Sequence, residues 1–157
     1  MIKVYRLSHK LALANYPDPF RPKQTNNRWN TNTVQIAYTS EHLALAALEL
    51  LNYWQNFGSM HGYKIFTYEF EENQLLELKQ IAPKLDIHNL KDTRAFGNNW
   101  AMQKQSLALK LPSVVLPHSY NYLINPNHSD FEANKVRDLG DFIYDSRITE
   151  LLARAKK

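Results

Sequence analysis

Segments that predict strands and segments that predict helices follow one another irregularly along the chain, and this order constrains the fold most. Strands are predicted at residues 2–7, 34–38, 63–70, 85–87, 107–111, 114–116, 120–124 and 141–144. Helices are predicted at residues 9–14, 41–57, 73–82, 93–105 and 147–155. A doubly wound fold requires strands and helices in regular alternation. The irregular order therefore predicts an α+β domain.

One domain is expected over residues 1–157, because the length is typical of a single domain and 44% of the residues are hydrophobic. No linker or repeat divides the chain. Cysteine is absent, which excludes disulfides and thiol chemistry. The first ten residues lack the apolar core of a signal peptide, and no segment approaches the ~18–20 apolar residues of a membrane span. We therefore expect a cytoplasmic protein with no membrane partner.

The net charge of +4 is spread along the chain, and the only adjacent basic pair is Lys156–Lys157. A nucleic-acid-binding protein usually concentrates its basic residues on one face. A mild positive excess suits an anionic small substrate or an acidic partner equally well. Charge alone therefore leaves the class of ligand open.

The segment from Tyr16 to Thr33 is expected to be a long loop, because Pro17, Pro19 and Pro22 interrupt regular structure. Long loops inside compact domains are often functional. Arg28 lies in this loop among Asn residues. Arg28 either binds a diphosphate or a carboxylate group, or it is a surface residue beside a core Trp29.

The helix predicted after Ser40, its expected N-cap, contains one unexpected carboxylate. Its buried stripe is expected to comprise Leu43, Ala47, Leu50 and Trp54, and Gly58 is expected to end the helix. Glu49 lies well away from that stripe on a helical wheel. It is therefore either a solvent-facing residue or a carboxylate held for chemistry.

Four further residues need a structural interpretation, and two of them, Tyr38 and Ser113, also have a functional one. Tyr38 ends a predicted strand and either stacks on a planar ligand or packs in the core. Ser113 follows Pro112 and either donates to a ligand or belongs to a turn. Asn125 precedes proline in a specific turn, and His128 is expected to be structural.

Common catalytic motifs are missing. The chain has four glycines, none in a GxGxxG arrangement, and it contains neither HExxH nor GxSxG. The six His residues lack metal-ligand spacing, so no metal site is expected. These absences argue against a Rossmann enzyme, a zinc hydrolase and an α/β-hydrolase.

The order of the remaining motifs resembles the RES family over residues 4–148. These motifs are NRWN, YTSEHLALAALE, Trp100, LPS, NYLINPNH and YDSRI. The family is named for an Arg, a Glu and a Ser, which match Arg28, Glu49 and Ser113, with Tyr38 as the aromatic companion. The chain departs from the family where Asn26 and Asn27 replace glycine before the Arg-Trp pair. It departs again at residues 31–33, where a further glycine is replaced.

The resemblance implies a fold like that of ADP-ribosyltransferases and diphtheria-type toxins. It implies a toxin of a toxin–antitoxin system that cleaves the nicotinamide–ribose bond of NAD and depletes cellular NAD. NAD would be a substrate, and no cofactor is expected. The implied partner is an Xre-type helix-turn-helix antitoxin, through which alone nucleic acid would be contacted, and the family also suggests a homodimer.

The resemblance assigns each matching residue a role. Arg28 would hold the diphosphate, Tyr38 would stack on nicotinamide, and Ser113 would orient the amide or the ribose. Glu49 would stabilise positive charge on the ribose, and Asn125 would join the NAD-binding set. One alternative is a transferase that moves ADP-ribose onto a specific protein. Another is a non-enzymatic nucleic-acid-binding module, which only the positive charge favours.

Overall fold

The computed structural model describes residues 1–57 and 61–155. Its strands are β1 (Ile2–His9), β2 (Ala37–Ser40), β3 (Tyr63–Phe70), β4 (Leu75–Glu77), β5 (Ala108–Pro112), β6 (Tyr120–Ile124) and β7 (Arg137–Phe142). Its helices are α1 (Lys10–Asn15), α2 (Leu43–Phe57), α3 (Leu78–Ile81), α4 (Leu90–Met102) and α5 (Ser146–Ala155), with 3₁₀ turns η1 (Glu72–Gln74) and η2 (Ala133–Lys135). The predicted α+β domain is confirmed.

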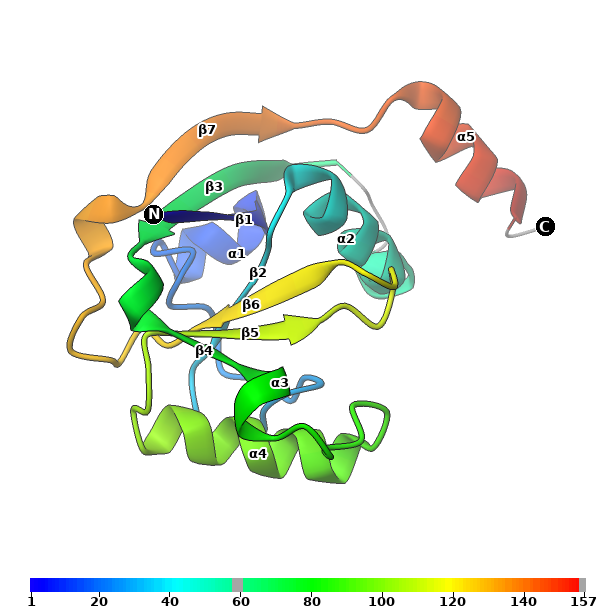
Figure 1. Cartoon of the computed structure of the whole chain (residues 1–157). Coiled ribbons are helices and arrows are strands. Elements are labelled where there is room, and N and C mark those ends of the chain that lie inside the picture. The colour runs from blue at the N-terminus through cyan, green and yellow to red at the C-terminus, as the bar shows by residue number, and fades with distance from the viewer. Residues whose placement is uncertain (58–60, 156–157) are drawn as a thin grey trace.

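All seven strands belong to one sheet in the order β4-β5-β6-β2-β1-β3-β7. Neighbouring strands are antiparallel, except that β4 and β5 are parallel. Figure 1 shows β7 and β3 above β6 and β5, with β2 running between the two groups. The short β2 therefore joins the two halves of the sheet at the centre of the molecule.

Two clusters of buried side chains hold the layers together. The first cluster includes Val4, Phe66 and Ile124. The second cluster includes Trp29, Trp100 and Leu123. Helix α4 lies below β4, β5 and β6 in Figure 1 and contributes the fully buried Trp100 to the second cluster. The loop that carries Trp29 is thus packed directly on α4.

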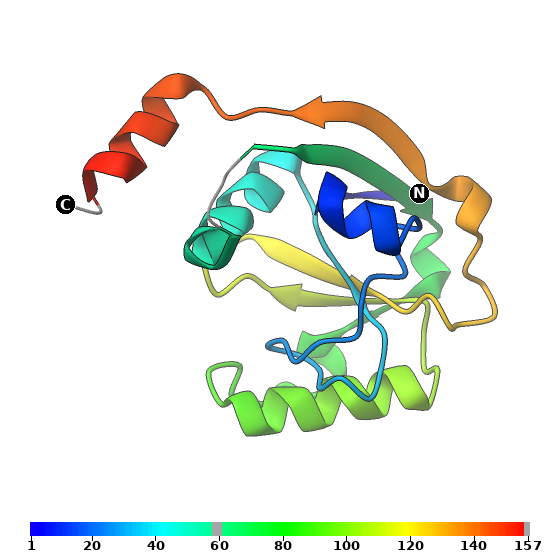
Figure 2. The ribbon, with the colours of Figure 1, turned by 180° about the vertical axis from the view of Figure 1, so that it is seen from behind.

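Helices α2 and α5 differ in how they are covered. Helix α2 packs against β1 and β2 and buries Leu45 and Ala46. Helix α5 extends away from the body of the domain in both views and buries none of its residues (Figures 1 and 2). None of the helices in the described ranges is both long and apolar enough to cross a membrane.

The loop prediction is confirmed, since no helix or strand occurs between α1 and β2. Several other predictions were wrong. The helix predicted at 73–82 is instead η1, β4 and α3, because residues 75–77 pair in parallel with β5. Residues 85–87 are irregular and lead into a turn, residues 114–116 form a bend, and neither segment is a strand. The last strand lies at 137–142 instead of 141–144.

The predicted buried stripe of α2 was also wrong. Leu43, Ala47 and Leu50 are only half-buried, because the helix turns Leu45 and Ala46 toward the sheet. The side chain of Trp54 and the whole of Gly58 lie outside the described residues. Ser40 ends β2 instead of capping the helix.

Candidate active site

Two cavities flank Glu49, one of about 310 Å³ and one of about 300 Å³. Four residues line both cavities, so they form a shared wall; they are Asn27, Tyr38, Glu49 and Asn121. The first cavity continues along β1, and the second continues toward α4. The two spaces together make a cleft with Glu49 at its middle.

Basic side chains outnumber acidic side chains around this cleft. Arg6 and Lys23 line the first cavity, and Arg28 and Arg94 line the second. Among the described residues that line either cavity, Glu49 is the one acidic side chain. A single carboxylate is therefore placed between two positively charged spaces, an arrangement that favours an anionic ligand.

Glu49 faces inward because of its position on α2. It follows the buried Leu45 by four residues and Ala46 by three, and residues at these spacings share one face of a helix. Its Oε1 accepts hydrogen bonds from Ser113 Oγ at 2.7 Å and from Asn121 Nδ2 at 2.6 Å. The solvent-facing interpretation of Glu49 was therefore wrong.

Ser113 holds the Glu49 carboxylate by a hydrogen bond and does not line the cavities. The Ser113 hydroxyl accepts the backbone N–H groups of Val115 and Leu116 and donates its proton to Glu49. Ser113 is buried and lines neither cavity. The structure thus brings Ser113 together with Glu49, but as a support of the carboxylate instead of a group facing the cleft.

Tyr38 lines both cavities, while its hydroxyl serves the fold. The hydroxyl donates to Asn30 Oδ1 at 2.6 Å and accepts the backbone N–H of Trp29 at 3.0 Å. The Tyr38 carbonyl oxygen accepts a hydrogen bond from Arg6. The ring is thereby held in place at the wall between the cavities.

Arg28 is positioned by helix α4. Thr93 Oγ1 donates to the Arg28 carbonyl oxygen at 2.6 Å, and Arg94 Nε donates to the Asn27 carbonyl oxygen at 2.7 Å. Within residues 1–57 and 61–155, the Arg28 guanidinium makes one hydrogen bond, of 3.3 Å, to the carbonyl oxygen of Ile87. Most of its donors therefore remain available to the second cavity.

The Asn residues that replace the family's glycines fit this loop without strain. Neither Asn26 nor Asn27 has a positive φ. Asn26 Oδ1 instead accepts the backbone N–H of Asn32 at 2.9 Å. The loop is therefore closed by a side-chain hydrogen bond, and glycine is not needed there.

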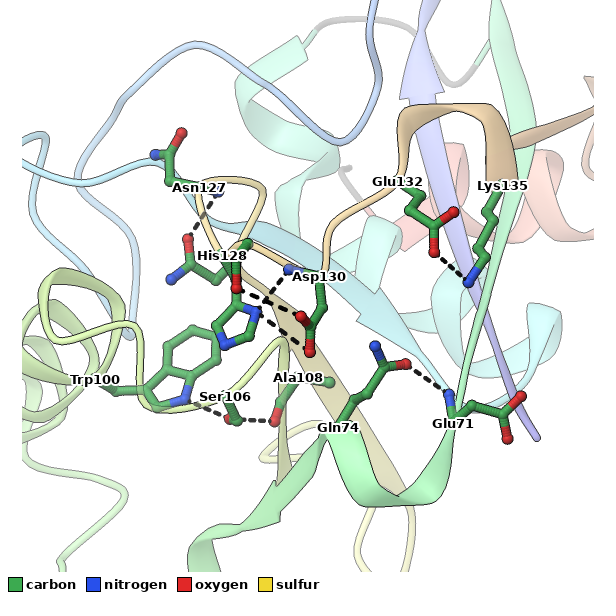
Figure 3. Close-up of polar contacts among 12 residues, drawn as sticks. Glu71, Gln74, Trp100, Ser106, Ala108, Asn127, His128, Asp130, Glu132 and Lys135 are labelled. Carbon is green, nitrogen blue, oxygen red and sulfur yellow. Dashed lines mark hydrogen bonds and ion pairs between the residues drawn. The ribbon is translucent and has the colours of Figure 1, made fainter.

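Asn125 lies apart from the other candidates. It is 1% exposed, its Nδ2 donates to the Ala101 carbonyl oxygen, and its Oδ1 accepts the backbone N–H of Asn127. It lines neither cavity. In the same turn His128 Nδ1 accepts the backbone N–H of Asp130 (Figure 3). The structure thus uses both Asn125 and His128 to build the turn.

Sequence reasoning missed three residues of the cleft. Asn121 was noticed only as part of a motif, Arg94 lay in a predicted helix without a role, and Arg6 lay without a role in the strand predicted at residues 2–7. Burial lowers the pKa of the Arg6 guanidinium to about 10, an effect that Tyr38 and Asp18 partly oppose. A charged residue at an inward position of a strand was the signal for Arg6.

Metal binding has no visible basis in the part of the chain that the structure describes. Within residues 1–57 and 61–155, no three His, Asp or Glu side chains gather closely enough to hold a metal ion.

Comparison with known proteins gives consistent results. The chain is 29% identical over 133 residues to the Prs ADP-ribosylating toxin of Sphingobium sp. (strain YBL2), covering 80% of this chain and 82% of that protein. It is 26% identical over 153 residues to Toxin Res of Yersinia enterocolitica, covering 92% of this chain and 98% of that protein.

The fold also has a solved counterpart. A chain of the M. tuberculosis MbcT-MbcA toxin-antitoxin complex superposes with a TM-score of 0.66 at 10% identity, covering 96% of this chain and 88% of that chain. At this identity the similarity concerns the fold alone. Residues 3–145 match the RES domain, and the chain therefore belongs to the RES domain family.

Proposed function

We propose that this protein is the toxin of a toxin–antitoxin pair and that it cleaves the nicotinamide–ribose bond of NAD. The observation that carries the proposal is a carboxylate, Glu49, held at the wall between two cavities; the other charged side chains that line them in the described part of the chain are basic. The names of the relatives from Sphingobium and Yersinia support a toxin, and the first of these names describes an ADP-ribosylating one.

The residues suit the chemistry of this bond. When the bond between ribose C1′ and the nicotinamide nitrogen breaks, its electron pair leaves with nicotinamide, which becomes a neutral ring. The ribose acquires oxocarbenium character, and a fixed carboxylate stabilises this developing positive charge. Glu49 takes this role. With water as acceptor, the water oxygen bonds to C1′ and one proton is released.

The basic residues would bind the anionic part of NAD. Arg28 and Arg94 lie together at the second cavity, and a guanidinium can pair with two phosphate oxygens at once. The Tyr38 ring, fixed at the wall, would stack on nicotinamide. Ser113 has a different role from the one first expected, because its hydroxyl is committed to Glu49. Asn125 has no part in this mechanism.

A transferase that attaches ADP-ribose to a protein is the second candidate, and it would use the same site. The name of the Sphingobium relative favours it. The likeness of the fold to ADP-ribosyltransferases also remains a prediction of this proposal. The two candidates differ only in the group that attacks C1′.

An antitoxin is the proposed partner, because a solved structure with this fold comes from a toxin–antitoxin complex. A toxin that meets NAD in the cell that makes it must have its cleft closed. The antitoxin would keep the cleft closed for as long as it remains bound. We expect a helix-turn-helix protein of Xre type in this role, and a cytoplasmic site of action.

Product analysis tests the proposal directly. The purified protein is incubated with NAD alone, with NAD and phosphate, and with NAD and cell extract. Nicotinamide release in all three reactions supports NAD cleavage, and the fate of ADP-ribose identifies the acceptor. If ADP-ribose becomes attached to a protein in the extract, while NAD incubated alone stays intact, the result would favour the transferase. Intact NAD in every reaction would refute both candidates.

A further inference from the structure

A chain of hydrogen bonds reaches Glu49 from the centre of the sheet. Ser40 Oγ donates to Asn121 Oδ1 at 2.7 Å, and Asn121 Nδ2 donates to Glu49 Oε1 at 2.6 Å. Ser40 ends β2 and Asn121 begins the facing part of β6, where the two residues pair directly across the sheet. Directly opposed residues of antiparallel strands place their side chains on the same face, so the contact is built into the register.

Both donors reach the same oxygen of Glu49. Ser113 Oγ and Asn121 Nδ2 each donate to Oε1. The Ser113 hydroxyl accepts two backbone N–H groups, so its one proton must point to Glu49. The carboxylate is thereby held by one oxygen, and its second oxygen is left for the cleft that Glu49 lines.

Glu49 and Ser40 together fix the orientation of the Asn121 amide. If the amide were reversed, its oxygen would lie 2.6 Å from Glu49 Oε1, and two acceptors would repel each other at that distance. The carboxylate therefore selects the end of the amide that faces it. The buried Ser40 hydroxyl donates to the opposite end and so holds the amide in that orientation.

We propose that Asn121, oriented by Ser40, is a positioning residue that holds the Glu49 carboxylate in its working direction at the wall between the two cavities. Asn121 acts through Glu49, so its loss should affect the rate of the reaction more than the affinity for the substrate. The kinetic test of this inference rests on the proposed function. The spectroscopic and growth tests do not require that the protein turns over NAD.

The experiment compares four variants of the residues in this hydrogen-bond chain with one matched control. Ser40→Ala removes the orienting proton, and Ser40→Thr keeps it. Asn121→Asp places an acceptor against Glu49, whereas Asn121→Leu has a similar shape without repulsion. The control is Ser106→Ala, because the buried Ser106 hydroxyl accepts from Trp100 Nε1 and donates to the Ala108 carbonyl oxygen far from the cleft (Figure 3).

The expected kinetic result is a fall in kcat of roughly 10- to 100-fold for Ser40→Ala, the scale reported for misplacement of a catalytic group. The KM for NAD should change by less than about threefold, as expected for a group that acts mainly in the transition state. Asn121→Asp should lose more activity than Asn121→Leu. Ser40→Thr should stay near the parent, and Ser106→Ala should lower the melting temperature without lowering kcat.

Two measurements do not require NAD turnover. In NMR spectra, the Asn121 side-chain amide protons should exchange slowly with solvent in the parent and in Ser106→Ala, and faster in Ser40→Ala. Growth inhibition in cells should follow the same order as kcat. If the parent leaves NAD intact, the proposed function fails, while these two measurements still decide the role of Asn121.

The inference is overturned in either of two cases. One is that folded Ser40→Ala and Asn121→Asp inhibit growth like the parent, and that Ser40→Ala leaves the exchange of the Asn121 side-chain amide unchanged. The other is that Asn121→Leu and Asn121→Asp behave alike and change KM instead of kcat, which would make Asn121 a part of the cavity wall only.

Discussion

Gly97 of α4 lies against the backbone of Trp29. A Cβ placed at Gly97 would meet the Trp29 carbonyl oxygen at 1.8 Å and its carbonyl carbon at 2.9 Å. The loop beside Arg28 therefore rests on the helix at a position where only glycine fits. Thr93 and Arg94 hold the same loop by hydrogen bonds one turn earlier.

Gly97→Ala should displace the loop and reduce activity. Alanine improves helix propensity by about 1 kcal/mol. Overpacking typically costs about 1–3 kcal/mol, and the clash here is with backbone, which cannot rotate away. We expect a net loss of unfolding free energy together with weaker NAD turnover, measured by thermal denaturation and steady-state kinetics.

Gly140→Ala provides the matched control. Gly140 has a φ of +97°, but nothing lies within 4 Å of a Cβ there. The substitution strains the backbone by about 1–2 kcal/mol without touching the cleft. It should lower the melting temperature and leave kcat/KM unchanged. Equal activity loss in both variants would show that stability alone explains the effect of Gly97→Ala.

The fold was predictable where one face of a segment is buried. Strand β3 was expected at residues 63–70 and occupies them, and helix α2 ends where expected. The segment from 73 to 82 was mistaken for a helix because its strand is only three residues long. Its pairing with β5 depends on a contact more than 30 residues away, which local periodicity does not contain.

The site was predictable only in part. Arg28, Tyr38 and Glu49 do line the cleft, yet the sequence placed Glu49 outside the buried face because Leu43 and Ala47 were chosen as its centre. Asn121 was overlooked since its role depends on the register between β2 and β6. Ser113 was found, but its hydrogen bond to Glu49 joins residues 64 positions apart, which local sequence patterns do not reveal.

Arg28→Lys should weaken NAD use although the charge is kept. A lysine ammonium cannot reproduce two parallel hydrogen bonds to a diphosphate. Losing one charge-assisted hydrogen bond costs about 1.5 kcal/mol, so kcat/KM should fall roughly tenfold, mainly through KM. Steady-state kinetics with varied NAD checks this.

Arg21→Lys is the control for this prediction. Arg21 also uses two guanidinium nitrogens, which donate to the Pro126 carbonyl oxygen and to Asn127 Oδ1. It lines neither cavity. Its replacement should affect stability and leave KM unchanged. Parental kinetics in Arg28→Lys would exclude Arg28 as the diphosphate ligand.

Antitoxin binding should protect the loop that borders both cavities. Pro22, Lys23 and Thr25 line the first cavity, and Asn26 and Arg28 line the second. A partner that closes the cleft must cover this segment. Hydrogen exchange of residues 23–28 should slow when the antitoxin is added, with η1 as an internal reference. Unchanged exchange in the loop would place the interface elsewhere.

Glu49→Gln should abolish NAD cleavage while preserving the fold. Gln has nearly the same size and a comparable helix propensity. Its side-chain oxygen can still accept from Ser113 and Asn121, so the change removes the charge and keeps the hydrogen bonds. The variant therefore separates electrostatic stabilisation from positioning.

The expected loss of kcat in Glu49→Gln depends on the stage of the reaction at which the Glu49 charge is needed. The ground-state ribose carries little positive charge, so NAD binding should change little. In the transition state the carboxylate faces a developing cation, and removal of such a contact typically lowers kcat by about 100- to 1,000-fold. The test measures kcat, NAD affinity and melting temperature for parent and variant.

Glu41→Gln is the control for the loss of a negative charge near the start of α2. Glu41 Oε1 accepts the backbone N–H of Tyr120 at 2.8 Å, and the side chain lines neither cavity. If charge near the cleft mattered only at long range, the two variants would lose activity to a similar degree. We expect instead that Glu41→Gln keeps kcat within about twofold of the parent, because salt screens exposed charges. A folded Glu49→Gln variant with near-parental kcat would exclude Glu49 as the stabilising carboxylate and would remove the basis of the proposed mechanism.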